Sequence, residues 1–213
     1  MLGVLMLDTH FPRPVGDVGH PGSFAMPVRH LRVGGATATR VVQAGRDEAL
    51  LDPFLQAGLD LVMQGARALT TSCGFLVRYQ QALQAALPVP VWTSALLKLP
   101  ELQSPGVITV NAQALGPNDL VAAGGAADTP VQGLAPGCSL QRTLLQDLDH
   151  LDADQAQADV VDAALRLVAR CPQVQTLVLE CTNMPPYAQA VAQATGRPVH
   201  HLMTLVHERW KLL

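Results

Sequence analysis

Residues 176–187 of the chain are TLVLECTNMPPY, an apolar run that ends at Glu180 and Cys181 and is followed by polar residues and two prolines. A short apolar run bounded by turn-forming residues is typical of a buried strand. A helical pattern covers residues 186–195, and Pro198 begins the next apolar run, 17 residues after Cys181. This segment therefore predicts a strand, a turn that carries Cys181, a helix and a second strand.

The first half of the chain repeats this layout. Residues 68–75 are ALTTSCGF, an apolar run that ends at Cys73, and a helical pattern follows over residues 75–86. Pro90 begins the next apolar run, again 17 residues after the cysteine. Further upstream, the apolar run over residues 3–7 is followed by Asp8, and the apolar run over residues 106–110 is followed by Asn111. Each half therefore also has an earlier predicted strand that ends at a polar residue. The repetition predicts two similar lobes.

Strands alternate with helices along most of the chain. Alternation of this kind indicates an α/β fold in which each lobe is a mainly parallel sheet flanked by helices. We expect a first lobe over residues 1–97, a second over 98–203, and a C-terminal helix over 204–213 that packs back on the first. If a pseudo-twofold axis relates the lobes, the carboxyl ends of both sheets meet at one active site between them, which both cysteines then line.

Composition limits the classes of function. The chain has 213 residues, of which 49% are hydrophobic, and 14 basic residues are scattered among 17 acidic ones. The absence of a basic cluster argues against nucleic acid as a partner. No apolar run reaches the roughly 18 residues that cross a bilayer, and the first residues lack the basic start of a signal peptide. We therefore expect a cytoplasmic protein with reduced cysteines and no membrane partner.

The histidines do not predict a metal site. His200 and His201 are neighbours in a predicted strand, where their side chains point to opposite faces and cannot grip one ion together. The spacing of His10, His20 and His30 fits no familiar zinc pattern. We expect no metal and no other cofactor.

Residues 9–35 are rich in proline and glycine and show no sustained periodicity. We expect a long loop that leaves the carboxyl end of the first strand, where open α/β sheets bind their ligands. Two interpretations stay open at this point: a mobile cover over the site, or a loop pinned to the surface.

The position of the two cysteines suggests acid and base roles. The start of a helix favours an anion, so we expect the thiols of Cys73 and Cys181 to ionise more readily than a free cysteine. A carbon between a thiolate and a thiol can lose a proton on one face and gain one on the other, which inverts the centre. We expect orienting side chains beside the cysteines, Thr71, Ser72, Thr182 and Asn183, while Asp8 either accepts a substrate N–H or caps its own turn.

The two segments around the cysteines, residues 70–75 and 179–187, resemble the cysteine motifs of the aspartate/glutamate racemase superfamily, and the resemblance extends over nearly the whole chain. It implies that Cys73 and Cys181 act as acid and base without pyridoxal phosphate or metal, and that the protein is a homodimer. It also implies a substrate site at the matching positions, namely Asp8, Thr71, Ser72, Gly74, Thr182 and Asn183. Two positions depart from the amino-acid racemases: Gly74 and Phe75 stand where Asn-Thr is typical, and Asn183 replaces a common His or Glu.

The leading hypothesis is an isomerase, a cofactor-independent racemase or epimerase of the amino-acid or hydantoin type, acting on a small carboxylate or amide-type substrate. One alternative is a decarboxylase or a cis–trans isomerase of the same superfamily. Another is a protein that binds a metabolite without chemistry. The weakest is a redox protein with a disulfide between the two cysteines, because exchange-active pairs usually lie close in sequence.

Overall fold

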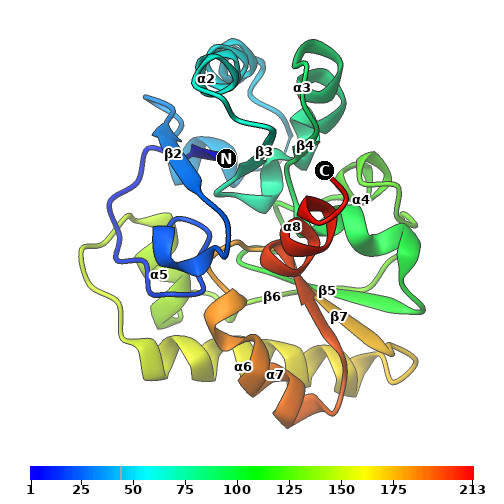
Figure 1. Cartoon of the computed structure of the whole chain (residues 1–213). Helices are drawn as coiled ribbons and strands as arrows, with labels where there is room; N and C mark the ends of the chain where they lie inside the picture. Colours follow the sequence, from blue (N-terminus) through cyan, green and yellow to red (C-terminus); the bar gives the residue numbers. More distant parts are fainter. Residues whose placement is uncertain (44) are drawn as a thin grey trace.

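The computed structural model describes residues 1–43 and 45–213. Its strands form two four-stranded sheets with the orders β2-β1-β3-β4 and β6-β5-β7-β8 (Figure 1). Every strand pair in both sheets is parallel. The predicted α/β fold of two lobes is therefore confirmed. The strands are β1 (Leu2–Met6), β2 (Val28–Arg32), β3 (Ala68–Thr71), β4 (Val91–Trp92), β5 (Pro105–Thr109), β6 (Val131–Gly133), β7 (Thr176–Leu179) and β8 (Val199–His201).

Helices separate the strands and cover the sheets. In Figure 1, α2 and α3 lie on the outer side of the first sheet, and α6 and α7 lie on the outer side of the second. The α-helices are α1 (Ala38–Val41), α2 (Leu51–Met63), α3 (Gln80–Ala86), α4 (Pro117–Ala122), α5 (Ser139–Leu145), α6 (Ala153–Arg170), α7 (Ala188–Thr195) and α8 (Leu202–Trp210). The 3-10 helices are η1 (Pro21–Ser23), η2 (Glu48–Leu50), η3 (Gly74–Tyr79), η4 (Ala95–Glu101) and η5 (Pro185–Tyr187).

The two lobes match at the level of single residues. Gly3 in β1 and Gly106 in β5 occupy equivalent positions, and each lies under the long helix of its lobe. A methyl group at Gly3 would lie 3.0 Å from Leu61 of α2, and one at Gly106 would lie 2.9 Å from Leu167 of α6. Both distances are shorter than ordinary contacts of a Cβ atom, so glycine lets helix and strand approach closely in both lobes.

The prediction of one long loop over residues 9–35 is wrong in part, because that segment contains η1 and the edge strand β2. The sequence of β2 is VRHLR, and none of its residues is fully buried. An edge strand exposes one side and is often charged, so it lacks the apolar alternation on which the prediction relied. The short strand β6 escaped notice for the same reason, with two of its three residues only half-buried.

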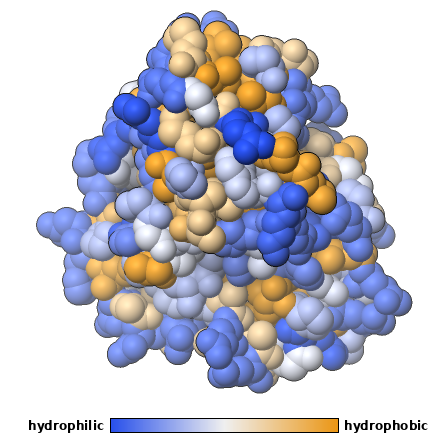
Figure 2. All heavy atoms as spheres, viewed as in Figure 1, coloured by the Kyte–Doolittle hydropathy of each residue, from blue (hydrophilic) through white to orange (hydrophobic). Residues whose placement is uncertain are grey.

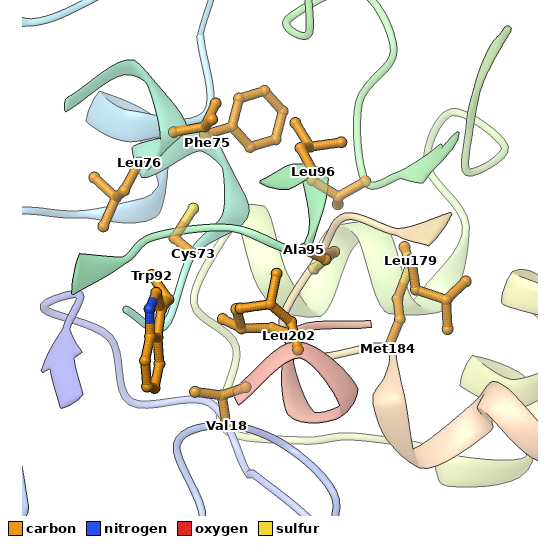
Figure 3. Packing of buried hydrophobic residues seen from close by; sticks show 14 of the residues in the cluster. Val18, Cys73, Phe75, Leu76, Trp92, Ala95, Leu96, Leu179, Met184 and Leu202 are labelled. Atoms are coloured by element: carbon orange, nitrogen blue, oxygen red, sulfur yellow. The ribbon is translucent and has the colours of Figure 1, made fainter. Parts of the chain in front are cut away.

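The hydrophobic core is continuous between the lobes. Buried residues of both sheets belong to one cluster, and Figure 3 shows Cys73 and Trp92 of the first lobe near Leu202 of the second. The C-terminal end of the chain reaches the first lobe, because the Arg67 guanidinium donates to the backbone oxygen of Leu213 at 2.7 Å. The lobes are thus joined by packing as well as by the chain itself.

The face in Figure 2 is mostly polar, with hydrophobic residues in small separate patches. Among the helices of residues 1–43 and 45–213, none is both long enough and apolar enough to span a membrane.

Candidate active site

Both cysteines line one cavity between the two sheets. Cys73 is the N-cap residue of η3, and Cys181 follows the end of β7 by two residues. The cavity has about 30 Å³ of space accessible to water, on the order of two water molecules. Its polar lining is Ser72, Cys73, Glu180, Cys181 and Asn183, and its remaining lining is Leu7, Phe11, Ala38, Val42, Gly74, Phe75, Val110, Leu144 and Leu145. Neither cysteine is in a disulfide.

Threonine hydroxyls hold the backbone beside the two cysteines. Thr182 Oγ1 donates to the backbone oxygen of Ser72 at 2.6 Å, a bond that joins the two cysteine segments across the lobes. Thr71 Oγ1 donates to the backbone oxygens of Cys73 and Thr93. Since both hydroxyls are turned toward backbone, Thr71 and Thr182 are not among the residues that line the cavity. Their contacts position the cysteines.

Asn183 connects Cys181 to the segment that precedes β2. The Cys181 thiol donates to Asn183 Oδ1 at 3.4 Å, and Asn183 Nδ2 donates to Asp17 Oδ2 at 2.6 Å. Asp17 is buried, and its other oxygen pairs with Arg13 at 2.9 Å. Because a carboxylate only accepts hydrogen bonds, Asp17 fixes the Asn183 amide with its oxygen toward the thiol.

The segment before β2 is also anchored to the second lobe at a separate place. Asp147 accepts hydrogen bonds from the backbone N–H groups of His10 and Phe11, at 2.6 and 3.0 Å. Phe11, which belongs to this second anchor, lines the cavity. The segment is therefore held to the second lobe at two places beside the cavity.

Asp8 lies away from the cavity lining. Its Oδ2 accepts a hydrogen bond from the backbone N–H of Gly35 at 2.9 Å, and its Oδ1 is 3.8 Å from the Arg32 guanidinium. In this structure Asp8 caps the turn that follows β2. Of the predicted substrate-site residues, the structure brings Ser72, Gly74 and Asn183 to the cavity together with both cysteines.

The expectation that the thiols ionise readily is wrong, because both are buried in this structure. Burial, followed by the charge of Glu180, raises the pKa of Cys73 to about 12 and raises the pKa of Cys181 well above its ordinary value. Each sulfur does face the backbone N–H of the second residue after it, Phe75 or Asn183, and that contact lowers the pKa. Loss of hydration outweighs the single backbone donor. Both thiols are therefore neutral at pH 7.

Glu180 is a residue of the site to which the sequence analysis gave no role. Its side chain is fully buried, and Oε2 accepts a hydrogen bond from Thr109 Oγ1 at 2.7 Å. Oε1 has no hydrogen-bond partner among the described residues. Burial raises the pKa of Glu180 to about 7. The sequence did contain a feature that could have identified Glu180. It is a carboxylate at the end of an otherwise apolar strand, directly before the second cysteine.

Glu180 occupies the space of a missing side chain in the other lobe. A methyl group at Gly74 would lie 2.3 Å from both the backbone oxygen and Oε1 of Glu180. Any side chain at position 74 would therefore collide with Glu180. The glycine that departs from the racemase pattern makes room for a carboxylate from the opposite lobe.

This contact predicts the effect of Gly74→Ala. We expect the variant to lose about 1–3 kcal/mol of unfolding free energy, because backbone and a buried carboxylate must both shift. Activity should fall as well, since Cys73 and Glu180 move together. Urea denaturation measures the loss, with Gly34→Ala as the control, because nothing lies within 4 Å of a methyl group at Gly34. Equal stability of the two variants would contradict the prediction.

The charge inside the cavity is acidic or neutral. None of the described residues that line it is a lysine, arginine or histidine. Arg13 and Arg78 lie nearby but are paired with Asp17 and Asp119. Within the described residues, no three His, Cys, Asp or Glu side chains are grouped closely enough to hold a metal ion. Backbone N–H groups beside the cysteines are thus the available donors for an anionic ligand.

No family model matches the chain. Among curated proteins, it is 28% identical over 225 residues to dimethylsulfoniopropionate lyase 7 of Emiliania huxleyi (strain CCMP1516), covering 95% of this chain and 64% of that protein. It is also 28% identical over 212 residues to dimethylsulfoniopropionate lyase of Durusdinium sp. clade D, covering 93% of this chain and 70% of that protein. The chain thus spans less than two thirds of the first relative.

Solved structures of three enzymes resemble the whole chain. Allantoin racemase from Klebsiella pneumoniae superposes with a TM-score of 0.67 at 14% identity, covering 100% of this chain and 89% of that one. The chain shares the fold of this enzyme. Unliganded arylmalonate decarboxylase gives 0.59 at 15% identity, covering 93% and 86%. Glutamate racemase from Francisella tularensis subsp. tularensis SCHU S4, in complex with D-glutamate, gives 0.56 at 14% identity, covering 100% and 80%. These likenesses establish the fold, and the activity stays a prediction.

Proposed function

We propose that this protein is a lyase that removes the proton next to the carboxylate of a small substrate and expels a leaving group from the adjacent carbon. The observation that carries the proposal is the placement of Cys73 and Cys181 on one mostly apolar cavity. An apolar cavity favours proton removal from carbon, because it strengthens every electrostatic contact with the developing charge. The names of the curated relatives support elimination over racemisation.

Dimethylsulfoniopropionate is the first substrate to test. It carries a hydrogen on the carbon next to its carboxylate and a dimethylsulfonium group on the following carbon. A base takes the hydrogen as a proton, a double bond forms between the two carbons, and the carbon–sulfur bond breaks. The electron pair leaves with sulfur as dimethyl sulfide, and acrylate remains. The step needs one base and no oxidant, reductant or cofactor.

The cavity lining suits a small substrate with an apolar end. Phe11 and Phe75 are part of the lining, and aromatic rings attract cationic groups that carry methyl substituents. One face of each ring is covered by a guanidinium, that of Arg13 or Arg78, so only the other face is open to a ligand. We expect the substrate carboxylate to meet backbone N–H groups of the two turns that carry the cysteines. The space accessible to water in the cavity is smaller than such a substrate, so we infer that the segment over residues 9–35, which contributes Phe11 to the lining, moves to admit it. In this structure the segment is anchored through Asp17 and Asp147.

Racemisation is the second candidate, and the symmetry of the thiols favours it. Cys73 and Cys181 occupy equivalent positions of the two lobes, and each faces the backbone N–H of the residue two further on. Two equivalent sulfurs on one cavity are what proton exchange at both faces of a carbon requires. Decarboxylation, the reaction of a protein with the same fold, is compatible with the same cavity.

A single assay in deuterated water separates these functions. The protein is incubated with dimethylsulfoniopropionate, enantiopure glutamate, enantiopure allantoin or an arylmalonate, and the mixtures are followed by proton NMR. We expect acrylate and dimethyl sulfide from the first substrate. Deuterium uptake with loss of optical activity in glutamate or allantoin, without elimination from the sulfonium, would replace the proposal with a racemase. Carbon dioxide release from the malonate alone would replace it with a decarboxylase.

A further inference from the structure

We infer that Glu180 is a third acid/base group of this site, which accepts the proton of the Cys73 thiol and later releases it to solvent. The inference rests on the proposed function for its catalytic part. Glu180 contacts both cysteine segments, but a mechanism with two cysteines gives it no role. The inference assigns it one.

The first support is the placement of the carboxylate. Glu180 lines the cavity with both cysteines, and Thr109 fixes one of its oxygens at 2.7 Å. The other oxygen, Oε1, lies beside the main chain of Gly74, the residue that follows Cys73. The Cys73 thiol makes no direct hydrogen bond to this oxygen, so the proton passes between them through one water molecule, for which the cavity has room.

The second support is the cost of burying this side chain. An ionised carboxylate with a bare oxygen is destabilising in a protein interior unless a counter-ion or donor compensates it. Arg78, the arginine whose charge lowers the pKa of Glu180, makes a bidentate pair with Asp119, at 2.7 and 2.9 Å. The charge of Arg78 therefore compensates the charge of an ionised Glu180 only in part. A purely structural role would be served equally by a neutral side chain of the same shape.

The third support is the set of charges around Glu180. The titratable and charged groups that act on it or on its neighbours are Cys73 and Arg78 of η3, Asp119 of α4, and Cys181 on its own segment. Arg78 and Asp119 act on the Glu180 carboxyl in opposite directions. Burial is the dominant effect and raises the pKa of Glu180 to about 7, so that the carboxyl exchanges its proton near neutral pH.

The two thiols differ in a way that selects Cys73 as the proton donor to Glu180. The fields of Arg78 and Arg13 lower the pKa of Cys73, although burial dominates and raises it. The charges around Cys181 all raise its pKa, and its thiol donates to Asn183. Cys73 is thus the sulfur that forms a thiolate more easily, while Cys181 keeps its proton.

The proposed step conserves charge inside the cavity. The Sγ–H bond of Cys73 breaks and an Oε1–H bond forms on Glu180, so one negative charge moves from oxygen to sulfur. A thiolate beside an ionised Glu180 would place two negative charges in the same mostly apolar cavity, which costs more. The thiolate then takes the substrate proton and becomes a thiol again. Glu180 resets by losing its proton to water, which accounts for the proton that elimination releases.

The first test needs no substrate. Iodoacetamide alkylation of Cys73 is followed by mass spectrometry at about pH 8–10, below the pKa of the thiol, in wild type and in Glu180→Gln. We expect the alkylation rate in this range to rise about 10-fold or more in Glu180→Gln, because the neutral amide no longer repels a thiolate. Glu48→Gln, which changes an exposed carboxylate, should leave the rate unchanged. An unchanged rate in Glu180→Gln would overturn the inference.

A stability measurement checks that Glu180 titrates. Its pKa is raised in the folded state, so its contribution to stability is complete below about pH 4.5 and is lost as the pH rises toward 7. The unfolding free energy of wild type should therefore fall relative to Glu180→Gln over this interval. Comparing the two proteins removes the contribution of the histidines, which is common to both. Parallel curves would overturn the inference.

The catalytic test uses the pH profile of kcat/KM. We expect wild type to gain activity up to about pH 7 as Glu180 ionises, and Glu180→Gln to lose this inflection with a loss of about 10²-fold in rate. Thr109→Val removes a hydrogen bond that lowers the pKa of Glu180, so it should shift the inflection upward. Retention of the inflection in Glu180→Gln would overturn the role. If no substrate turns over, the proposed function fails, while alkylation and stability still decide the inference.

Discussion

Replacing Cys73 by serine is expected to lower the rate of the reaction by about 10³-fold or more. A serine hydroxyl in the same buried position is a far weaker acid than a thiol, so almost no base forms at neutral pH. The fold should persist, because the two side chains differ little in size. Initial rates with the substrate identified in the NMR assay measure the loss, and urea denaturation confirms that stability is close to that of wild type.

Cys181→Ser is expected to lose a similar factor for a different reason. Cys181 lines the same cavity, and its thiol donates to Asn183. In the proposed reaction the thiol turns to the substrate and donates to the charge that develops on its carboxylate. Cys138→Ser and Cys171→Ser are the matched controls, because both cysteines are only partly buried and neither lines the cavity. Wild-type activity in either Cys73→Ser or Cys181→Ser would defeat a mechanism that needs both sulfurs.

Solvent exchange makes the cysteine variants more informative. Each variant retains one sulfur, so a racemase would still exchange hydrogen at one face of the substrate while losing inversion. In an elimination enzyme, the same variants would lose product formation. They would not exchange hydrogen at one face of an enantiopure substrate. The pair of variants therefore tests the site and the reaction class in the same measurement.

The fold could be predicted because its signal is periodic and repeated. The strands that carry the signal, β1, β3 and β7, are fully buried, so their apolar runs stand out from polar surroundings. The edge strands β2 and β6 could not be found in this way, since their exposed sides carry ordinary surface residues. Parallel pairing also joins residues far apart in the chain, which local patterns do not report.

The candidate site was predictable to the extent that it follows the repeat. Cys73 and Cys181 were found because they occupy the same place in both halves. Glu180 was not, because it has no acidic counterpart in the first half, where Ser72 occupies the position before the cysteine. Its importance depends on Gly74, a contact between lobes that no local pattern reveals.

Arg78→Met is expected to cost about 3–5 kcal/mol of unfolding free energy. The guanidinium lies in η3 of the first lobe and pairs with Asp119 in α4 of the second, and both side chains are almost completely buried. It also donates to the backbone oxygens of Gln43 and Ala114. Removing the guanidinium leaves the buried Asp119 carboxylate without its counter-ion. An uncompensated buried charge lowers the unfolding free energy strongly. Urea denaturation measures the loss.

The control for Arg78→Met is Arg166→Met, which breaks an exposed pair with Asp162 and should cost less than about 1 kcal/mol. The double variant Arg78→Met with Asp119→Asn should be more stable than the sum of the single variants predicts, because it removes the uncompensated charge as well. Strict additivity would show that the pair is not a coupled unit.

The same pair also separates electrostatics from general damage to the site. Arg78 lowers the pKa of Glu180, whereas Asp119 raises it. Arg78→Met should therefore move the inflection of the activity profile to higher pH, and Asp119→Asn should move it to lower pH, although both variants lose stability. Loosened packing alone would shift both profiles in the same direction or neither. Opposite shifts would mean that charges on α4 and η3 set the proton affinity of a carboxyl between the two cysteines.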